Sequence, residues 1–510
     1  MSGYKFIITS DADGKAASAG SAAKSHAIRA GIRNGWMSPG AIGAERSRDT
    51  VRCKKELNGR YRLPRDKGTR RDHPNGRDKT GLRQSGRPGR MLAISTTLSE
   101  TVFDPFDSLP IPQNRQVEEL ISYFLSRFNL NASSKGPKML WFPYAMQSVP
   151  AMCSTLALTA AYCTAKAPLL EGSNSDLQQE GLRQKGEAMR LIGKWLSQVD
   201  VVPQDAQSAF FVTSISTLAC VEVLQGNFEA ADTHLVGVRN LLHSLGGHER
   251  FRDEILCKSI NIADILLAAG LGRVPLFPLL HSGAVDLPDE IYKQASEPPL
   301  DHLISLGGGS NDLVQIFSYL RQATYAKGSD VVTPESLRIL MNLADHCILR
   351  HLYGSSCQDT STSSQRLAIA ITLAAHLFMY VILREVPTNS LLVRTMGSRL
   401  HKAVQEMVDD EDIWQGHFDA LQWIACVGLL GAGTEASDMR DKGQYFVALF
   451  ESCTVRSRNG LRIEVRDPAE LERCLSKFLW DGKRCNRMLQ VVVGSGVPVR
   501  LDLIENYLFR

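Results

Sequence analysis

The sequence lacks the cysteine spacing of a structural zinc site. It contains 11 cysteines but no Cys-x-x-Cys pair, and Cys53 stands alone in the first 150 residues. Structural zinc needs four converging ligands, which proteins usually supply as short Cys-x-x-Cys knuckles. Cys220 and Cys426 lie inside apolar runs, where a thiol packs as a small hydrophobic group. We therefore predict no metal site, and free thiols of the kind found in a reducing compartment.

Motifs of catalysis are also missing. The glycines of Gly307–Ser310 are not followed by the Gly-Lys-Ser/Thr ending of a P-loop, and Gly494–Gly496 is too short for a nucleophile elbow. His346 and His351 do not share a helix face, which a helical metal pair would require. The acidic run Asp409–Asp412 is better explained as favouring the start of the next helix. We predict no catalytic residue, no cofactor and no enzymatic activity.

No apolar run is long enough to span a membrane comfortably. The longest uncharged one, Leu367–Leu383, is bounded by Arg366 and Arg384 and contains Thr372 and His376. Its length is at the short limit for a transmembrane helix. A buried core helix is the better interpretation, and we predict no membrane association.

Charge is unevenly distributed along the chain. Residues 1–90 contain 21 Lys and Arg against 8 Asp and Glu, a net charge of +13, whereas the remaining residues contain 37 and 46, a net charge of −9. Residues 46–90 have almost no large apolar side chains, so they cannot bury enough surface to offset the entropy of ordering. We predict a disordered basic arm over residues 1–95. It is either a solvated tail or a segment that contacts a polyanion.

One short motif in this arm favours nucleic acid. The segment Ser85–Arg90 partly resembles an AT-hook, whose arginines enter the narrow minor groove of A·T tracts. Ser85 occupies the position of the first core arginine, so the match is incomplete. Arginines of the arm could instead bind phosphates without sequence preference, and that binding would weaken steeply with salt. The predicted nucleic-acid contacts are Arg70, Arg71, Arg83, Arg87 and Arg90.

From residue 114 onward the apolar pattern is helical. Val117, Leu120 and Phe124 recur at steps of three and four residues, as on one face of a helix. Further helices are predicted at 151–165, 176–196, 204–224, 227–245, 250–269, 312–326, 334–353, 365–385, 391–408, 413–430, 435–455 and 467–480. No helix is predicted for the Pro-bounded segment 137–150, and the plausible strands are 462–465 and 489–493. The pattern predicts an all-α, irregular multi-helix bundle over residues 110–480 and a poorly defined tail over 481–510.

Two of these helices should form a hairpin. Only a tight turn at Gln225–Gly226 separates 204–224 from 227–245, so we expect an antiparallel, tetratricopeptide-like pair. Asn227 suits a helix start, and Gly246–Gly247 suits a left-handed helix end. No 34-residue period continues on either side, so a repeat array is not predicted.

Three stretches resemble the fungal-specific transcription factor domain. The strongest is Leu182–Gly247, with Gly226–Asn227, Ala231, His234–Leu235, Gly237 and the closing Gly246–Gly247. The others are Trp423–Phe450, an apolar helix followed by a charged turn, and Leu471–Trp480. In that family this helical region follows a six-cysteine zinc cluster, which this sequence does not contain.

The resemblance implies a nuclear or nucleocytoplasmic transcription regulator. Its helical domain would bind a protein partner or a small effector, and DNA would be reached through the basic arm or through a partner. His234 would be a buried, hydrogen-bonded histidine in preference to a ligand-binding one. Two alternatives stay open: a helical protein-interaction scaffold with no role at chromatin, and, with less support, an enzyme of an unrecognised kind.

Overall fold

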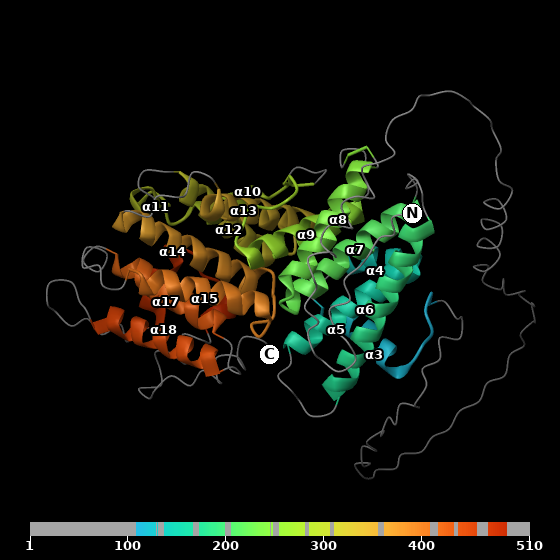
Figure 1. Ribbon diagram of the computed structural model, residues 1–510. Helices are drawn as coiled ribbons and strands as arrows, with labels where there is room; N and C mark the ends of the chain where they lie inside the picture. The colour runs from blue at the N-terminus through green and yellow to red at the C-terminus, as the bar shows by residue number, and fades with distance from the viewer. Residues whose placement is uncertain are drawn as a thin grey trace, which may run out of the picture. The chain divides into compact units, whose positions relative to one another are not determined.

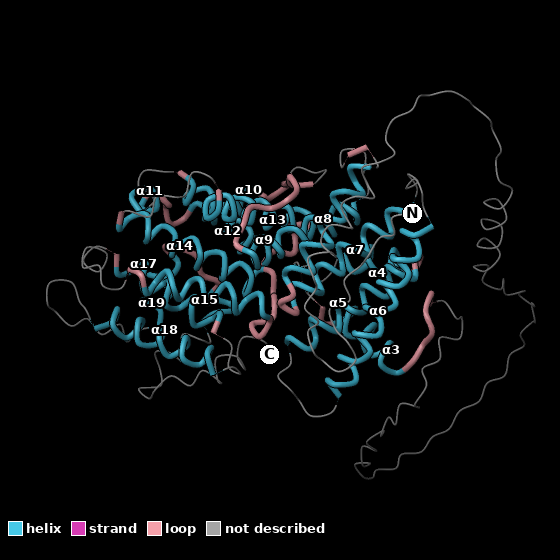
Figure 2. The backbone as a smooth tube through the Cα atoms, viewed as in Figure 1, coloured by secondary structure: helices cyan, strands magenta, loops and turns pink. Residues whose placement is uncertain are grey.

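All the regular secondary structure in the described part of the molecule is helical. The computed structural model describes residues 109–128, 130, 137–166, 173–198, 206–244, 246–247, 254–280, 285–306, 311–354, 362–407, 417–432, 437–455 and 468–486. Within these ranges there are the 17 helical segments named below, one of them a π-helix, a further short helical stretch at 482–486, and no strand (Figure 2). The predicted all-α fold is confirmed. The predicted arm 1–95 and the strands 462–465 and 489–493 lie outside the described residues.

The helices fall into two successive groups along the chain (Figure 1). The first group is α3 (Arg115–Ser126), α4 (Pro137–Ala145), α5 (Val149–Lys166), α6 (Ser173–Gln198), α7 (Ala206–Leu224), α8 (Phe228–Ser244) and α9 (Glu254–Leu271). The second is α10 (Asp289–Ser296), α11 (His302–Leu306), α12 (Asp312–Lys327), α13 (Pro334–Tyr353), α14 (Ser363–Phe378), the π-helix η2 (Met379–Leu383), α15 (Leu391–Gln405), α17 (Phe418–Gly431), α18 (Ser437–Val455) and α19 (Pro468–Ser476). Helix α9 joins the groups because it packs against α7 and α8 as well as α13 and α15.

Most predicted helices are present within a few residues of their expected ends. Three short ones were missed: α4, α10 and α11. Helix α4 begins at Pro137 and contains Pro143, and proline inside a helix normally argues against one. Helices α10 and α11 have only 8 and 5 residues, too few for the apolar period to show.

Local capping explains where several helices begin. Asn114 Oδ1 accepts a hydrogen bond from the Val117 amide at 2.7 Å, so α3 begins where the apolar stripe begins. Thr362 and Gln365 form a reciprocal capping box at the start of α14. Thr333 and Ser390 are simple N-caps of α13 and α15, and the side-chain oxygen of each accepts a hydrogen bond from the amide three residues later.

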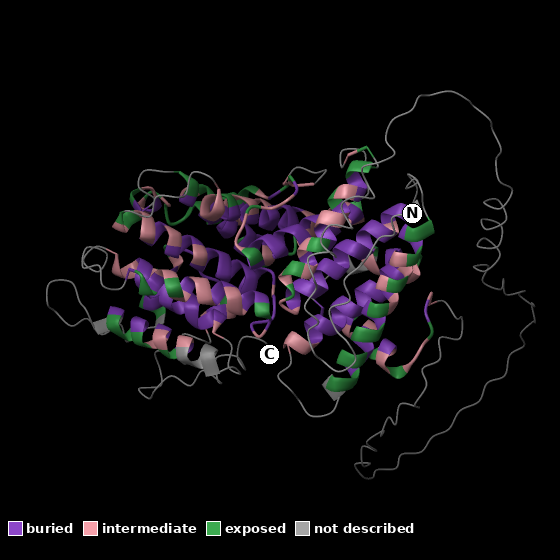
Figure 3. Cartoon of the chain, viewed as in Figure 1, coloured by how far each residue is buried: buried purple, intermediate pink, exposed green. Residues whose placement is uncertain are grey.

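The core is built from helices that are buried on nearly every side. Figure 3 shows burial along most of α7 and α14, whereas buried and exposed positions alternate on α6. The stretches Gln207–Leu224 and Ser363–Leu383 are long and apolar enough to cross a membrane, but 89% of each is buried inside the protein. The interpretation of Leu367–Leu383 as a core helix therefore agrees with the structure.

The predicted hairpin is formed by α7 and α8. The chain reverses at Gly226, whose φ of +79° favours glycine, and the Asn227 amide donates to the Glu222 carbonyl oxygen at 2.8 Å. A Cβ atom at Gly226 would overlap the side chain of Leu391, the first residue of α15. The turn is therefore packed closely against the second group of helices.

One buried arginine, Arg321, and one half-buried arginine, Arg399, donate to carbonyl oxygens at the C-terminal ends of other helices. The Arg321 guanidinium donates to the carbonyl oxygens of Ser476, Lys477 and Phe478 at the end of α19, the last at 3.0 Å. Arg399 donates to the carbonyls of Ala269 and Gly270 near the end of α9. The last carbonyls of a helix have no partner within it, so these cations satisfy acceptors that local sequence leaves open.

Candidate functional site

The residues predicted to contact nucleic acid lie outside the described part of the chain. This holds for Arg70, Arg71, Arg83, Arg87 and Arg90, and also for Gly307–Ser310 and Asp409–Asp412. Their assignment stays a prediction. His346 and His351, which were considered above as a metal pair, both lie on α13. His351 Nδ1 is 3.4 Å from Asp312 Oδ2. No group of three or more His, Cys, Asp or Glu side chains within the described residues could hold a metal ion.

A fully buried ion network lies between α13 and the end of α14. Asp345 of α13 and Arg384, which follows η2, are both 0% exposed. Arg384 Nε donates to Asp345 Oδ2 at 2.9 Å, and its Nη2 donates to the same oxygen. His376 Nε2 lies 3.0 Å from Asp345 Oδ1, so both carboxylate oxygens are engaged. A carboxylate can be buried at moderate cost only when it is paired in this way.

One polar group of this network is left without a partner. Arg384 Nη2 donates to Asn342 Oδ1 at 3.0 Å, which fixes the orientation of that amide. Asn342 Nδ2 then has no hydrogen-bond acceptor among the described residues, although Asn342 is only 1% exposed. A buried donor without an acceptor costs about 1 to 3 kcal/mol, so this amide is a local weak point of the network.

The π-helix positions Arg384. The Arg384 amide donates to the Met379 carbonyl at 2.8 Å, a hydrogen bond spanning five residues where an α-helix spans four. Glu385 then takes a φ of +53°, which is unfavourable for a residue with a Cβ atom. π-helical turns and left-handed non-glycine residues both concentrate at functional sites.

A lysine from α12 holds the end of this segment. Lys327 Nζ lies 2.7 Å from the carbonyl oxygens of both Ile382 and Leu383 and 2.8 Å from Glu385 Oε1. Burial lowers the pKa of Lys327 to about 8, although the Glu385 carboxylate acts in the opposite direction. The Tyr162 hydroxyl of α5 donates to the Glu385 carbonyl at 2.9 Å.

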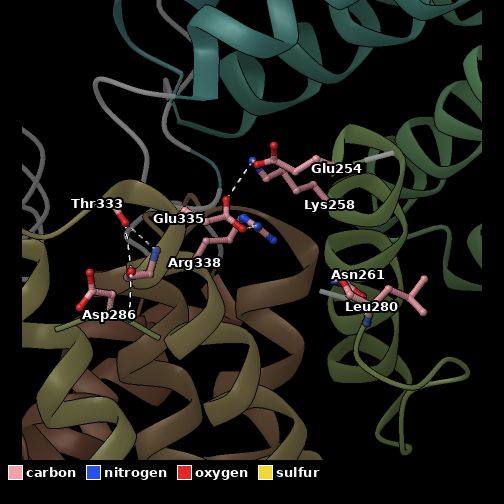
Figure 4. A network of polar contacts seen from close by, with 9 residues as sticks. Glu254, Lys258, Asn261, Leu280, Asp286, Thr333, Glu335 and Arg338 are labelled. Atoms are coloured by element: carbon pink, nitrogen blue, oxygen red, sulfur yellow. Dashed lines mark hydrogen bonds and ion pairs between the residues drawn. The ribbon is translucent and has the colours of Figure 1, made fainter. Parts of the chain in front are cut away.

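A second polar network joins α9 to the start of α13 (Figure 4). Lys258 Nζ pairs with Glu254 on its own helix and lies 3.0 Å from Glu335 Oε2 of α13. Glu335 also pairs with Arg338. Ser336 Oγ accepts from the Asp286 amide at 3.3 Å, so the segment before α10 is tied to α13.

The helical hairpin has its own buried acid, Glu222. Glu222 Oε1 lies 2.8 Å from Lys185 Nζ and 3.8 Å from His234 Nε2, and Oε2 accepts from Asn227 Nδ2 at 3.0 Å. Burial would raise the pKa of Glu222, but His234, Lys185 and Asn227 together lower it to about 2. His234 is buried as expected, with its Nε2 at ion-pair distance from Glu222 and its Nδ1 unpaired among the described residues.

The ion network was not predicted from the sequence, in which Arg384 stands only as the charged boundary of an apolar run. The available signal was an arginine directly adjoining the most apolar helix, together with Asp345 inside an apolar stripe of 334–353. Charged residues in such positions are almost never buried unless they are paired. Because these groups are fully buried, they do not face solvent or a substrate, and the arrangement suits conformational control better than catalysis.

Comparison with known families agrees with the sequence resemblance. The model of the fungal-specific transcription factor domain matches residues 119–459, about two thirds of the chain. This range takes in the helical hairpin, the ion network and the π-helix. No curated protein and no solved structure matches the chain. The match to most of the helical region shows that the chain belongs to the fungal-specific transcription factor domain family.

Proposed function

We propose that this protein is a nuclear or nucleocytoplasmic transcription regulator whose helical domain, residues 110–480, binds a protein partner or a small effector. Family membership gives the chain a transcription-regulator-like role and argues against an enzyme. The observation that carries the proposal is the extent of the family match, which includes most of the described helices.

The buried polar networks support a regulatory role for the helical domain. A fully buried ion pair adds little to stability compared with apolar residues of the same size, but it can specify one conformation among several. The pair Asp345–Arg384 and the unpaired Asn342 amide are features of this kind. A domain that rearranges on binding would have to break or exchange these contacts, so they are the groups through which binding could select one arrangement of the helices.

We propose that DNA is contacted either by the basic arm or by a partner protein that binds this chain. The arm has a net charge of +13 over residues 1–90 and contains the five arginines named above. Contacts of arginine with phosphates bring affinity without sequence preference. Selection of particular loci would then come from a partner or from the partial AT-hook at Ser85–Arg90.

The proposal is tested by chromatin immunoprecipitation of the tagged full-length chain from its own host. Enrichment at discrete loci supports a regulator. Absence of enrichment from a soluble, well-expressed protein favours the alternative function, a helical scaffold with no role at chromatin.

Two variants locate the segment responsible. One lacks residues 1–95, and the other replaces Arg70, Arg71, Arg83, Arg87 and Arg90 with alanine in the full chain. Replacement of Arg115, Arg183 and Arg190, which are at least half exposed on the helical body, is the control for removing positive charge outside the arm, although it removes three charges instead of five. Enrichment that survives removal of residues 1–95 shows that a partner or the helical domain brings the protein to DNA.

A further inference from the structure

The segment Met379–Glu385 receives polar contacts from four other helices. They come from Tyr162 of α5, Lys327 of α12 and Asp345 of α13, while the Tyr380 hydroxyl donates to the Ile265 carbonyl of α9 at 3.4 Å. These helices are drawn from both groups of the fold. A change of conformation in these seven residues would therefore alter contacts with α5, α9, α12 and α13.

The segment holds an unfavourable backbone conformation. Its π-turn contains one more residue than an α-helical turn, and Glu385 is the one non-glycine residue with positive φ among the described residues. The carbonyls of Ile382 and Leu383 accept from Lys327 at the end of the π-turn. The present state is thus held by contacts from outside the helix.

The regular α-helix is the natural alternative conformation for such a segment. If α14 continued as a regular α-helix, the extra residue would be absorbed and Glu385 could leave the left-handed region. Each residue of an α-helix turns the chain by about 100°, so a shift of one residue would rotate Arg384 away from Asp345. Packed interiors move between discrete arrangements because they cannot deform continuously.

We propose that Met379–Glu385 is a two-state joint, held in its π-helical state by Lys327 and Tyr162, whose alternative is the α-helical register. Binding of a partner or effector shifts this joint and so changes how α5, α9, α12 and α13 are coupled. The regulatory part of this inference rests on the proposed function, but the existence of the two states does not.

Hydrogen–deuterium exchange of the full chain tests whether the segment opens separately from the rest of the core. The amides of Arg384 and Val386 are useful reporters because they donate to the carbonyls of Met379 and Tyr380 at 2.8 and 2.9 Å. In low urea we expect them to exchange at least about tenfold faster than the amides of α5 and α17, with little dependence on urea, as in a local opening. Exchange that merges with global unfolding would overturn the joint.

Substitutions then separate the joint from general destabilisation. Tyr162→Phe removes one hydrogen bond to the π-helical state, and we expect exchange about tenfold faster that is confined to residues 379–386. Tyr292→Phe, at a tyrosine that is 44% exposed, is the matched control and should change nothing. An equal increase throughout the core for Tyr162→Phe would contradict the proposal.

A pair of variants at Glu385 isolates the backbone strain. Glu385→Gly and Glu385→Ala both remove the carboxylate that pairs with Lys327, and they differ in the Cβ atom. Because positive φ is unfavourable only for alanine, the alanine variant should exchange about tenfold faster in this segment. Equal rates in the two variants would show that Glu385 stores no strain.

A transcriptional reporter distinguishes failure of the joint from failure of the proposed function. If Tyr162→Phe changes exchange in the segment and reporter output together, both inferences are supported. A changed exchange with unchanged output overturns the regulatory role and leaves the joint standing. If Tyr162→Phe raises amide exchange equally throughout the core, the two-state joint is overturned, whatever the reporter output.

Discussion

Arg384 donates from both Nε and Nη2 to one carboxylate oxygen of Asp345, a residue 39 positions earlier in the chain, with both side chains fully buried. This ion pair connects α13 to the end of α14. Loss of either side chain would strongly destabilise the fold, because the remaining charge would be buried without an opposite charge beside it.

Removal of one charge from this pair should therefore be strongly destabilising. We expect Asp345→Ala to lower the free energy of unfolding by about 3 to 5 kcal/mol, measured as a lower midpoint in urea. The double variant Asp345→Leu with Arg384→Met should be closer to the wild type, because no charge is then left buried. Glu187→Ala, which breaks a surface pair with Arg190, is the control and should cost less than about 1 kcal/mol. A small loss for Asp345→Ala would show that the pair is not buried in solution.

Glu222 should make the hairpin sensitive to acid. Its pKa of about 2 lies below the ordinary value of 4.5, so the folded state binds this proton more weakly than the unfolded chain does. The resulting stabilisation is fully present above pH 4.5 and is lost as the pH falls towards 2, with a total of about 3 kcal/mol. The free energy of unfolding measured between pH 6 and 3 should therefore fall less steeply for Glu222→Gln. An unchanged slope would mean that Lys185 and His234 do not stabilise the charged carboxylate.

Two glycines near each other in sequence should respond in opposite ways to alanine. Gly226→Ala meets a φ of +79° and the side chain of Leu391, so we expect a loss of about 2 to 4 kcal/mol. Gly237→Ala lies within α8, where an added Cβ meets nothing within 4 Å, and should stabilise by up to about 1 kcal/mol. Thermal unfolding of both variants measures the contrast. Similar melting temperatures would contradict the close packing of the hairpin turn against α15.

The five arginines of the arm should give DNA binding a recognisable salt dependence. If each contacts one phosphate, the slope of log K against log salt concentration is about −4 to −5, and affinity falls about 500-fold between 50 and 200 mM salt. Fluorescence anisotropy with duplex DNA measures this slope. Each substitution among Arg70, Arg71, Arg83, Arg87 and Arg90 should reduce it by about 0.9 and affect all sequences alike. A reduction confined to A·T tracts would instead favour the AT-hook interpretation of Ser85–Arg90.

Much of the helical layout could be predicted because its signals are local. The period of Val117, Leu120 and Phe124, the cap at Asn114 and the turn at Gly226 act over a few residues and hold in the structure. The same locality explains the omissions. Pro143 argued against a helix at α4, and α11 is shorter than two turns. Neither segment therefore shows a clear apolar period in the sequence.

Local sequence signals specify that the described part of the chain is helical, where most of its helices begin and end, and which family the helical domain resembles. Which charged groups meet depends instead on how the helices pack. Asp345 pairs with Arg384. Lys327 donates to the last carbonyl oxygens of the π-helix, and Arg399 donates to a carbonyl oxygen near the end of α9. A hydrogen-bond ladder and an apolar stripe are specified by neighbours within one or two turns, whereas these partners are 39, 55 and 130 residues apart. Their pairing depends on how the helices pack, because only packing brings such distant groups within 3 Å and removes the water that would otherwise solvate them.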